Sequence, residues 1–254
     1  MSDSENTSPF FEVRDLRQTL DGHPVLRGVT FDVPRGQTTV ILGGSGAGKS
    51  VLLKHLNGLM RPFSGSVKVD GTDIGGLSEE ALRSIRRQIG VLFQDGALFD
   101  SLTVGENVAF PLREAGEKDE ARLRYRVDEV LELVDLKGQQ GKMPGVLSGG
   151  MRKRAALARA IAGRPACMLY DEPTAGLDPI LSESITRLIA EMKDDLRLTS
   201  VVVTHHLGAM RFLADRVIFL QHGEVRYDGP PAGLEATDDR IIREFLSADT
   251  MGRT

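Results

Sequence analysis

The stretch VILGGSGAGKS, residues 40–50, decides the fold of this chain. It begins as an apolar run of strand length and leads into a helix predicted from about Gly48 to Asn57. The turn between them is glycine-rich and matches the phosphate-binding pattern G-x-x-x-x-G-K-S. Backbone N–H groups of such a turn wrap around a phosphate chain, and side chains there would block the approach. The stretch therefore predicts a strand, a phosphate-binding loop and a helix in succession.

Two side chains in this loop carry the expected chemistry. Lys49 is predicted to reach the terminal phosphates, and the Ser50 hydroxyl to bind Mg²⁺. A chance glycine-rich turn is the alternative, but the strand before the loop and the helix after it argue against that. The nucleotide-binding residues expected from this segment are Gly43, Gly44, Ser45, Gly46, Ala47, Gly48, Lys49, Ser50 and Val51.

A second apolar run, CMLYDEP, ends in two acids, Asp171 and Glu172. Ligands of open α/β sheets bind at the carboxyl ends of the strands, which is where this pair is expected. Asp171 is predicted to hold Mg²⁺ indirectly, by contacting the groups that bind the ion directly. Glu172 is predicted to orient and deprotonate water, a role that typically contributes about 10²–10⁴ in rate. An acidic strand end that is merely solvated is the alternative.

Strand-like runs alternate with helical patterns along most of the chain. The runs are FFEVRDL, PVLRGVTFDV, TTVILG, IGVLFQ, CMLYDE, SVVVTHH and RVIFLQ. This alternation predicts a doubly wound α/β fold with a parallel sheet. From about Gly96 to Gly163 the pattern is helical throughout, which predicts a separate lobe. One later helix is expected to begin at Asp178 and Pro179, and a hairpin is expected to turn at His222 and Gly223.

The composition narrows the class of protein. The 254 residues carry a net charge of -4, which argues against the broad basic surface of a nucleic-acid binder. Cys167 is the single cysteine, which excludes an internal disulfide framework. The N-terminal MSDSENTSPF lacks the basic and apolar regions of a secretory signal. No apolar run reaches the roughly 20 residues that a membrane helix needs, so any membrane role is expected to require a partner.

The stretch LSGGMRKRAALARA, residues 147–160, predicts an anion site that contains no reactive group of its own. Ser148, Gly149 and Gly150 open a helix whose N–H groups can receive an anion. Three cations follow at once, Arg152, Lys153 and Arg154, although a helix start already carries positive partial charge. These cations indicate either a solvated face or part of a nucleotide site.

Two histidines, His205 and His206, end the run SVVVTHH. A histidine at a strand end could contact a terminal phosphate, whereas a lone histidine pair often has no function. A zinc site is a weaker interpretation, because no Cys/His cluster accompanies the pair.

Taken in order, these motifs resemble those of the ATP-binding cassette (ABC) ATPases over nearly the whole chain. The resemblance implies a P-loop NTPase (RecA-like) core with a mostly parallel sheet, an N-terminal antiparallel β subdomain and an inserted α-helical subdomain. The implied division is a disordered tail at 1–10, the core at 11–95 and 164–246, the helical signature subdomain at 96–163, and a C-terminal tail at 247–254. The C-terminal stretch DDRIIREFLSADTMGRT is expected to include a short amphipathic helix that packs on its own domain, the dimer mate or a regulatory subunit.

The resemblance also explains the LSGGM stretch. In ABC ATPases two subunits pair head to tail, and the signature of one caps the γ-phosphate held by the other. Ser148, Gly149 and Gly150 are therefore expected to bind ATP that arrives on a second chain. The resemblance therefore implies that this chain pairs with a second copy of itself or with a sister subunit.

Further roles are carried over from the family to matching positions. Gln94 resembles the Q-loop glutamine near Mg²⁺ and the attacking water, Asp178 the D-loop aspartate, and His205 the switch histidine. The resulting catalytic set is Glu172, His205 and Gln94, and the expected metal-holding set is Ser50, Gln94 and Asp171.

Two positions depart from the usual family pattern. Met151 replaces the glutamine that normally ends the signature, while the serine and both glycines are intact. Leu20 falls where many relatives carry an aromatic that stacks on adenine. Leu20 can still make an apolar contact with the base, but the loss of stacking leaves GTP open as a second nucleotide.

Two stretches, FQDGALFDSLTVGENVAFPLRE and KMPGVLSGGMRKRAALARAIA, are similar to the ATPases of MCE-associated lipid transporters, the Mla and Mkl types. This similarity implies an ATPase dimer on the cytoplasmic face of the inner membrane, a permease dimer and an MCE-domain lipid-binding protein. Leu98, Phe99 and Leu102 are expected either to contact the permease or to form the core of the helical lobe.

Three other readings compete with lipid transport. The first is the ATPase of a small-solute importer of the amino-acid type, which shares the motifs. The second is an ABC protein acting on DNA or ribosomes, against which stand the negative charge and the single cassette. The third is an ATP-sensing regulator without turnover, which the presence of Glu172 argues against.

Overall fold

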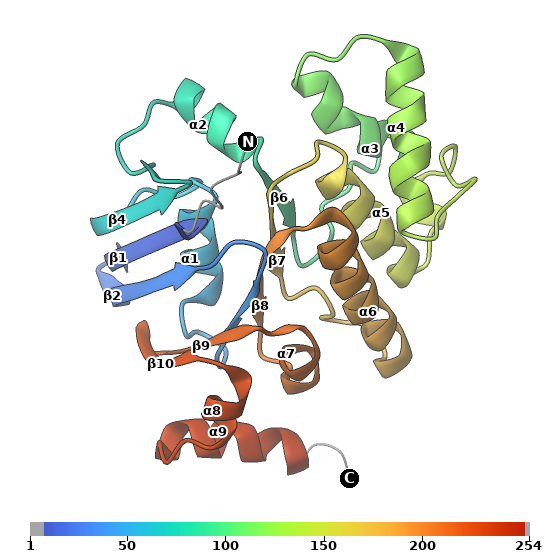
Figure 1. Ribbon diagram of the computed structural model, residues 1–254. Coiled ribbons are helices and arrows are strands. Elements are labelled where there is room, and N and C mark those ends of the chain that lie inside the picture. The colour runs from blue at the N-terminus through green and yellow to red at the C-terminus, as the bar shows by residue number, and fades with distance from the viewer. Residues whose placement is uncertain (1–7, 252–254) are drawn as a thin grey trace, which may run out of the picture. The chain divides into compact units, whose positions relative to one another are not determined.

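The structure is a computed structural model that describes residues 8–251, with side chains to residue 247 (Figure 1). The chain forms two compact units. Unit 1 combines Met1–Arg86 with Thr199–Thr254, and unit 2 is Arg87–Leu198. This grouping differs from the division into core and helical subdomain expected from the sequence, which stays a prediction.

A four-stranded antiparallel sheet occupies the first part of unit 1, in the order β2-β1-β4-β5 (Figure 1). Its strands are β1 (Phe11–Leu20), β2 (His23–Val33), β4 (Ser64–Val69) and β5 (Thr72–Asp73). Alternate residues of β1 and β2 are buried, as expected for strands with one face on the core. The strand-like runs found in the sequence predicted β1 and β2. They did not predict β4 and β5, which are short and rich in serine, glycine and threonine.

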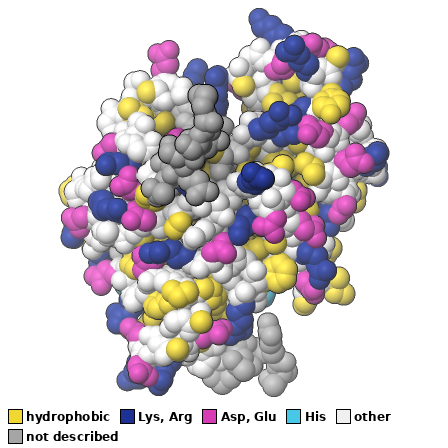
Figure 2. Space-filling view, viewed as in Figure 1, with side chains coloured by type: hydrophobic (Ala, Val, Ile, Leu, Met, Phe, Trp, Pro, Cys, Tyr) yellow, Lys and Arg dark blue, Asp and Glu magenta, His cyan; other side chains and the backbone are white. Residues whose placement is uncertain are grey.

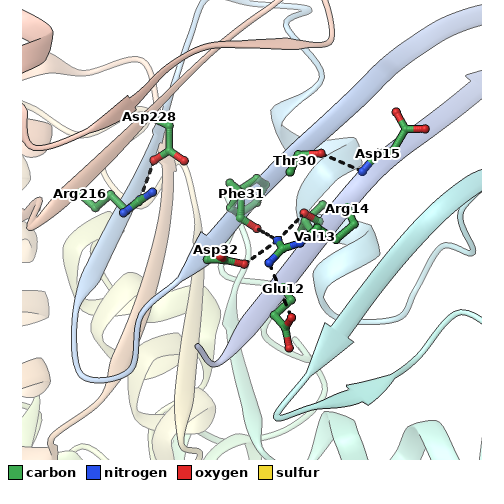
Figure 3. Close-up of polar contacts among 9 residues, drawn as sticks. All are labelled: Glu12, Val13, Arg14, Asp15, Thr30, Phe31, Asp32, Arg216 and Asp228. Atoms are coloured by element: carbon green, nitrogen blue, oxygen red, sulfur yellow. Dashed lines mark hydrogen bonds and ion pairs between the residues drawn. The ribbon is translucent and has the colours of Figure 1, made fainter. Parts of the chain in front are cut away.

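Polar contacts hold a bulge in β1 (Figure 3). The pairing of β1 with β2 shifts register after Val13, and Asp15 adopts a positive φ of 42°. The Asp15 N–H, freed by the bulge, donates to the Thr30 hydroxyl at 2.9 Å. Beside it the Arg14 guanidinium donates to the Asp32 carboxylate at 2.6 Å, and this hydrogen bond raises the pKa of Arg14. Side chains of β2 therefore supply hydrogen-bond partners for the polar groups at the bulge.

A second sheet of unit 1 runs in the order β10-β9-β3-β8. The strands β3 (Thr38–Leu42), β8 (Thr199–Thr204) and β9 (Arg216–Gln221) are parallel, and β10 (Glu224–Gly229) is antiparallel to β9. Every residue of β3 and β8 is buried, as expected for central parallel strands. The predicted hairpin is confirmed, with positive φ at both His222 (48°) and Gly223 (79°).

The helices of unit 1 are α1 (Lys49–Leu56), α2 (Glu79–Arg86), α7 (Leu207–Leu213), α8 (Pro231–Glu235) and α9 (Arg240–Met251). Helix α9 extends into the segment assigned to the C-terminal tail, and the Phe245 ring packs on Phe219 of β9 at 5.1 Å. Phe10, assigned to the N-terminal tail, is 1% exposed, because its N–H pairs with the Val33 carbonyl at 2.8 Å. Of the rest of the predicted tail, Ser8 is exposed and Pro9 is half-buried, and residues 1–7 lie outside the described residues.

Unit 2 contains two parallel strands and four α-helices. The elements are β6 (Ile89–Leu92), α3 (Val104–Glu114), α4 (Glu120–Leu133), a short 3₁₀ helix η1 (Pro144–Val146), α5 (Gly149–Ile161), β7 (Cys167–Asp171) and α6 (Pro179–Leu196). Helix α6 begins as predicted, with the Asp178 carboxylate accepting from the Leu181 N–H at 3.0 Å and proline as the first helical residue. In Figure 1, α3, α4 and α5 lie together.

The region from 96 to 163 is less uniformly helical than its sequence predicts. Residues 93–103 and 135–143 are irregular. The buried Arg126 side chain ties α4 to the end of α5, donating to the carbonyls of Ile161 (2.8 Å) and Ala162 (2.9 Å). A charged residue of α4 therefore contributes to packing between helices and not only to contact with water.

The charged surface matches the near-neutral composition. On the face shown in Figure 2, Lys and Arg side chains alternate with Asp and Glu. Within residues 8–251 no helix is both long and apolar enough to cross a membrane.

Candidate functional site

The predicted phosphate-binding loop lies between the buried strand β3 and helix α1 in unit 1. Gly46 (φ 73°) and Gly48 (φ 102°) adopt the left-handed conformation that glycine permits without strain. Gly48 precedes α1 and provides no side-chain cap for the helix. The first N–H groups of α1 therefore remain suited to an anion.

Lys49 folds over the loop. Its Nζ donates to the carbonyl of Gly43 at 2.8 Å and to that of Gly44 at 3.0 Å. The residue is 8% exposed, so these contacts satisfy a largely buried ammonium group. Ser50, the next residue, is exposed.

Gly43, a predicted member of the phosphate-binding loop, is required for packing. A Cβ at this position would lie 2.3 Å from the backbone oxygen of Leu220 in β9. At Gly44 and Gly46, by contrast, an added Cβ would meet nothing within 4 Å. The open side of the loop is therefore formed by Gly44 and Gly46.

Strand register brings His205 beside this loop. Strands β3 and β8 are parallel neighbours, and Leu42 pairs with Thr204. Gly43 and His205 each follow directly, so both leave the sheet at the same edge. His206, to which the sequence assigned no role, is the N-cap of α7, where its Nδ1 accepts from the Ala209 N–H at 3.1 Å.

Leu20 lies at the end of β1, where it pairs with His23 across the turn to β2. It is half-buried, which is compatible with an apolar contact to a base. The same hairpin meets the phosphate-binding loop, because a Cβ on Gly48 would lie 2.9 Å from the Leu26 side chain.

In unit 2, strand register joins three further predicted residues. Strands β6 and β7 are parallel, and Leu92 pairs with Tyr170. Asp171 ends β7, Glu172 follows it, and Gln94 comes two residues after Leu92, so all three lie at one strand edge. Glu172 has a φ of 46°, a conformation that is uncommon for a non-glycine residue and is enriched at functional sites.

The predicted anion site also lies in unit 2, at the start of α5. Ser148 is the N-cap, and its hydroxyl accepts from the Met151 N–H at 3.2 Å. Gly149 is half-buried and Ser148 is exposed. Gly150 is buried, and a Cβ there would lie 3.1 Å from the Leu181 side chain of α6. Asp178 is exposed at the N-cap of α6.

The three cations that follow the LSGGM stretch point to carbonyl oxygens. Arg152 donates to the Leu147 carbonyl at 2.7 Å. Arg154 donates to the Val134 carbonyl at 2.9 Å and to the Asp135 carboxylate at 2.6 Å. Lys153 donates from Nζ to the carbonyl of Gln94 itself.

Lys153 is the residue that sequence reasoning missed. It is 6% exposed, and this burial lowers its pKa, while the carboxylates of Asp95 and Asp171 act in the opposite direction. A lysine in a run of three cations gives no local signal that it is buried. Only the tertiary structure, in which α5 packs on the segment after β6, shows that Lys153 binds the Gln94 carbonyl.

The oxygen donors present fit Mg²⁺. Ser50 supplies a hydroxyl, and Gln94 and Asp171 supply an amide and a carboxylate oxygen. Within residues 8–251 no group of three or more His, Cys, Asp or Glu side chains could hold a metal ion. Mg²⁺ in nucleotide sites needs only one or two protein oxygens besides water and phosphate.

Comparison with known proteins places these motifs in a family. Residues 26–175 match the family described as ABC transporter. The chain is 43% identical over 241 residues to the probable ribonucleotide transport ATP-binding protein Mkl of Mycobacterium leprae, covering 95% of this chain and 70% of that protein. It is 41% identical over 224 residues to the methionine import ATP-binding protein MetN of Brucella abortus, covering 88% of this chain and 60% of that protein.

Solved structures agree with these sequence relatives. CbiO1 of Clostridium perfringens, part of the CbiONQ transporter complex, superposes with a TM-score of 0.83 at 32% identity, covering 96% of this chain and 98% of that one. The dimeric cassette MJ0796, bound to ADP and Pi, gives a TM-score of 0.79 at 32% identity, covering 87% and 98%. The expected fold, an α/β ABC ATPase with an antiparallel β subdomain, is confirmed. This chain belongs to the ABC transporter family of ATP-binding subunits.

Proposed function

We propose that this ABC ATPase hydrolyses ATP with the residues expected from its sequence and drives phospholipid transport in an MCE-type system. The assigned residues of unit 1 are the phosphate-binding loop Gly43–Val51 and His205, and those of unit 2 are Gln94, Asp171 and Glu172. The strand registers that bring Gly43 and His205 to one sheet edge, and Gln94 and Asp171 to one strand edge, support this assignment.

The proposed roles follow from the chemistry of each group. Lys49 and the loop N–H groups bind the phosphates, Leu20 contacts the base, and Glu172 accepts a proton from water. When bound with ATP, Mg²⁺ neutralises phosphate charge, and Ser50, Gln94 and Asp171 are the residues that would hold it. Ser148, Gly149, Gly150 and Asp178 act on the nucleotide of a second copy in a head-to-tail homodimer.

Similarity to the Mkl proteins over 95% of the chain is the observation that carries the lipid-transport proposal. Met151 at the end of the signature and the lack of an aromatic at position 20 fit the resemblance to that group drawn from the sequence. The proposed assembly places the ATPase dimer on the cytoplasmic face of the inner membrane, under a permease dimer and with an MCE-domain protein beyond it. A small regulatory subunit is a further proposed partner.

A pull-down tests the transport system. The chain carries an affinity tag and Glu172→Gln, so that the proposed ATP-bound dimer accumulates. Native membranes are solubilised with ATP and Mg²⁺, and co-purifying proteins and lipids are identified by mass spectrometry. An untagged preparation measures the background.

A permease with an MCE-domain protein and bound phospholipid is the expected result. Two outcomes would overturn the lipid proposal. A permease with a small-solute-binding protein would make the chain an importer ATPase, the second candidate, which the 41% identity to MetN favours. Bound ribonucleotide other than the added ATP and its ADP, without phospholipid, would support instead the transport that the name of Mkl gives for that relative.

A further inference from the structure

The segment that carries Gln94 is held in place by cations from another element. Between β6 and α3, residues 93–103 form no helix or strand. The backbone of such a segment lacks the regular hydrogen bonds of secondary structure, so its polar groups need other partners. Two N–H groups bond within the segment, Gly96 to Phe93 and Leu102 to Phe99, and side chains of α5 and α3 bond other polar groups of its backbone.

Helix α5 contacts the first half of the segment. Lys153 donates from Nζ to the Gln94 carbonyl. Arg159 donates to the carbonyls of Gly96 at 2.8 Å and Ala97 at 2.5 Å. Between these two cations the chain passes close to α5, since a Cβ on Gly96 would lie 3.2 Å from the Cβ of Ala156.

The backbone conformation of Ala97 indicates that these contacts stabilise an unfavourable conformation. Ala97 has a φ of 50°, in a region that favours glycine. A residue in such a conformation persists when its surroundings specify it. The Arg159 guanidinium binds the Ala97 carbonyl and also lies 6.0 Å from the centre of the Phe99 ring.

Helix α3 holds the second half. Asn107 is fully buried, and its Nδ2 donates to the carbonyls of Phe99, Leu102 and Thr103, each at 3.0 Å. Its Oδ1 accepts from the Phe99 N–H at 2.8 Å. Both halves of the segment are therefore bound to helices of unit 2, and the half that contains Gln94 is bound to α5.

A buried lysine that only stabilises the fold is the simpler explanation. Two observations argue for more. An ammonium group is costly to bury compared with an apolar side chain. In addition, the carbonyl that Lys153 binds belongs to the residue assigned to the reaction, and Lys153 lies within the first turns of the helix that Ser148 caps.

We propose that Lys153 and Arg159 are positioning residues, which fix Gln94 and the segment after it to α5 so that the Gln94 side chain and Ser148 move as one body. The inference rests on the proposed function for the role of Gln94, while the fixation itself does not. The two parts are therefore tested by separate measurements.

Hydrogen exchange of the nucleotide-free chain tests the fixation. The Gly96 N–H donates to the Phe93 carbonyl at 2.9 Å, so its exchange rate reports local opening of the segment. In Lys153→Met and in Arg159→Met we expect exchange in peptides spanning 94–99 to accelerate about tenfold or more, and Lys153→Arg to restore slow exchange. Arg154→Met is the control, because it removes a cation from the same helix together with its bonds to Val134, Asp135 and Ser184, none of which lies in the segment.

Steady-state hydrolysis tests whether the effect passes through Gln94. We expect Lys153→Met to lower kcat about tenfold while KM for ATP stays within about twofold. Adding Lys153→Met to Gln94→Ala should then lower kcat by no more than about twofold further, because both changes remove the same function.

Each outcome decides one part. Wild-type exchange rates in both Lys153→Met and Arg159→Met would overturn the fixation. Additive losses of kcat in the double variant would show that Lys153 acts on stability rather than through Gln94. If the wild-type chain hydrolyses no ATP, the proposed function fails, and the exchange result still decides the fixation.

Discussion

Gly43 and Gly44 are neighbours in the phosphate-binding loop, yet they meet different surroundings. The position of a Cβ on Gly43 is blocked by the backbone oxygen of Leu220, and that of a Cβ on Gly44 is open. The sequence motif predicts the same role for both, which is to let a phosphate approach the backbone. The structure separates a glycine needed for the fold from one that is free to serve the ligand.

This difference predicts opposite effects of one methyl group. Gly43→Ala should lower the free energy of unfolding by about 1–3 kcal/mol even without nucleotide, because a backbone atom cannot move aside easily. Gly44→Ala should stay within about 0.5 kcal/mol of wild type but bind ATP about tenfold more weakly. Urea denaturation with and without ATP measures both. Equal loss of stability in the two variants would contradict the packing argument.

Glu172 is the residue on which turnover is predicted to depend. Glu172→Gln keeps the size of the side chain and removes the base, so nucleotide affinity should stay within about twofold while turnover falls about 100-fold or more. Phosphate release and binding of a fluorescent ATP analogue measure the two effects. Hydrolysis near the wild-type rate would exclude Glu172 as the base.

At the scale of elements, caps and buried polar side chains decide where helices begin. Helix α3 starts at a capping box, in which Thr103 accepts from the Glu106 N–H at 3.2 Å and Glu106 accepts from the Thr103 N–H at 2.7 Å. The spacing T-x-x-E is a readable signal, and it would have placed the start of α3 within the long helical pattern.

Helix α1 contains a buried histidine that makes its stability depend on pH. His55 is 1% exposed, its Nδ1 donates to the Val51 carbonyl at 2.8 Å, and burial lowers its pKa below 6.5. Above that pH the histidine is neutral in the folded and unfolded chains alike. As the pH falls through 6.5, the unfolded chain binds a proton that the folded chain resists, so stability decreases.

We therefore expect the free energy of unfolding to fall more steeply between about pH 7.5 and pH 5.5 in wild type than in His55→Gln. The variant removes the titrating group and should be less stable at the higher pH. Urea denaturation at both pH values measures the difference. Identical pH slopes in the two proteins would show that His55 is not the source.

At the scale of the whole molecule, the LSGGM stretch is expected to act only in a pair of chains. Ser148 is exposed in the structure, as a residue that binds ATP on a second copy must be. Ser148→Arg, in the Glu172→Gln background, should bind ATP as a monomer, because the larger cation obstructs the contact between copies. Light scattering after size exclusion, with ATP and Mg²⁺, should show dimers only when Ser148 is present. Dimers in both proteins would refute the composite site.

Local sequence predicted much of this protein. The glycine spacing at 43–48, the apolar runs of β3, β7 and β8, and the Asp178-Pro179 start of α6 depend on residues close together in the chain. The family resemblance built on these motifs is confirmed by the comparisons. Short-range sterics and helix capping determine such features, so a pattern of a few neighbouring residues is enough to predict them.

Tertiary structure alone decided the partners of individual side chains. The Leu220 carbonyl that demands glycine at 43, and the carbonyl of Gln94 that Lys153 binds, come from strands and loops far away in sequence. Phe10 is buried for the same reason, through pairing with Val33. Such contacts depend on which strands pair and in which register, and no local pattern encodes that choice. The sequence by itself determined the family and which residues are candidates for its chemistry, because motifs are local, and the fold decided which distant residues contact those candidates.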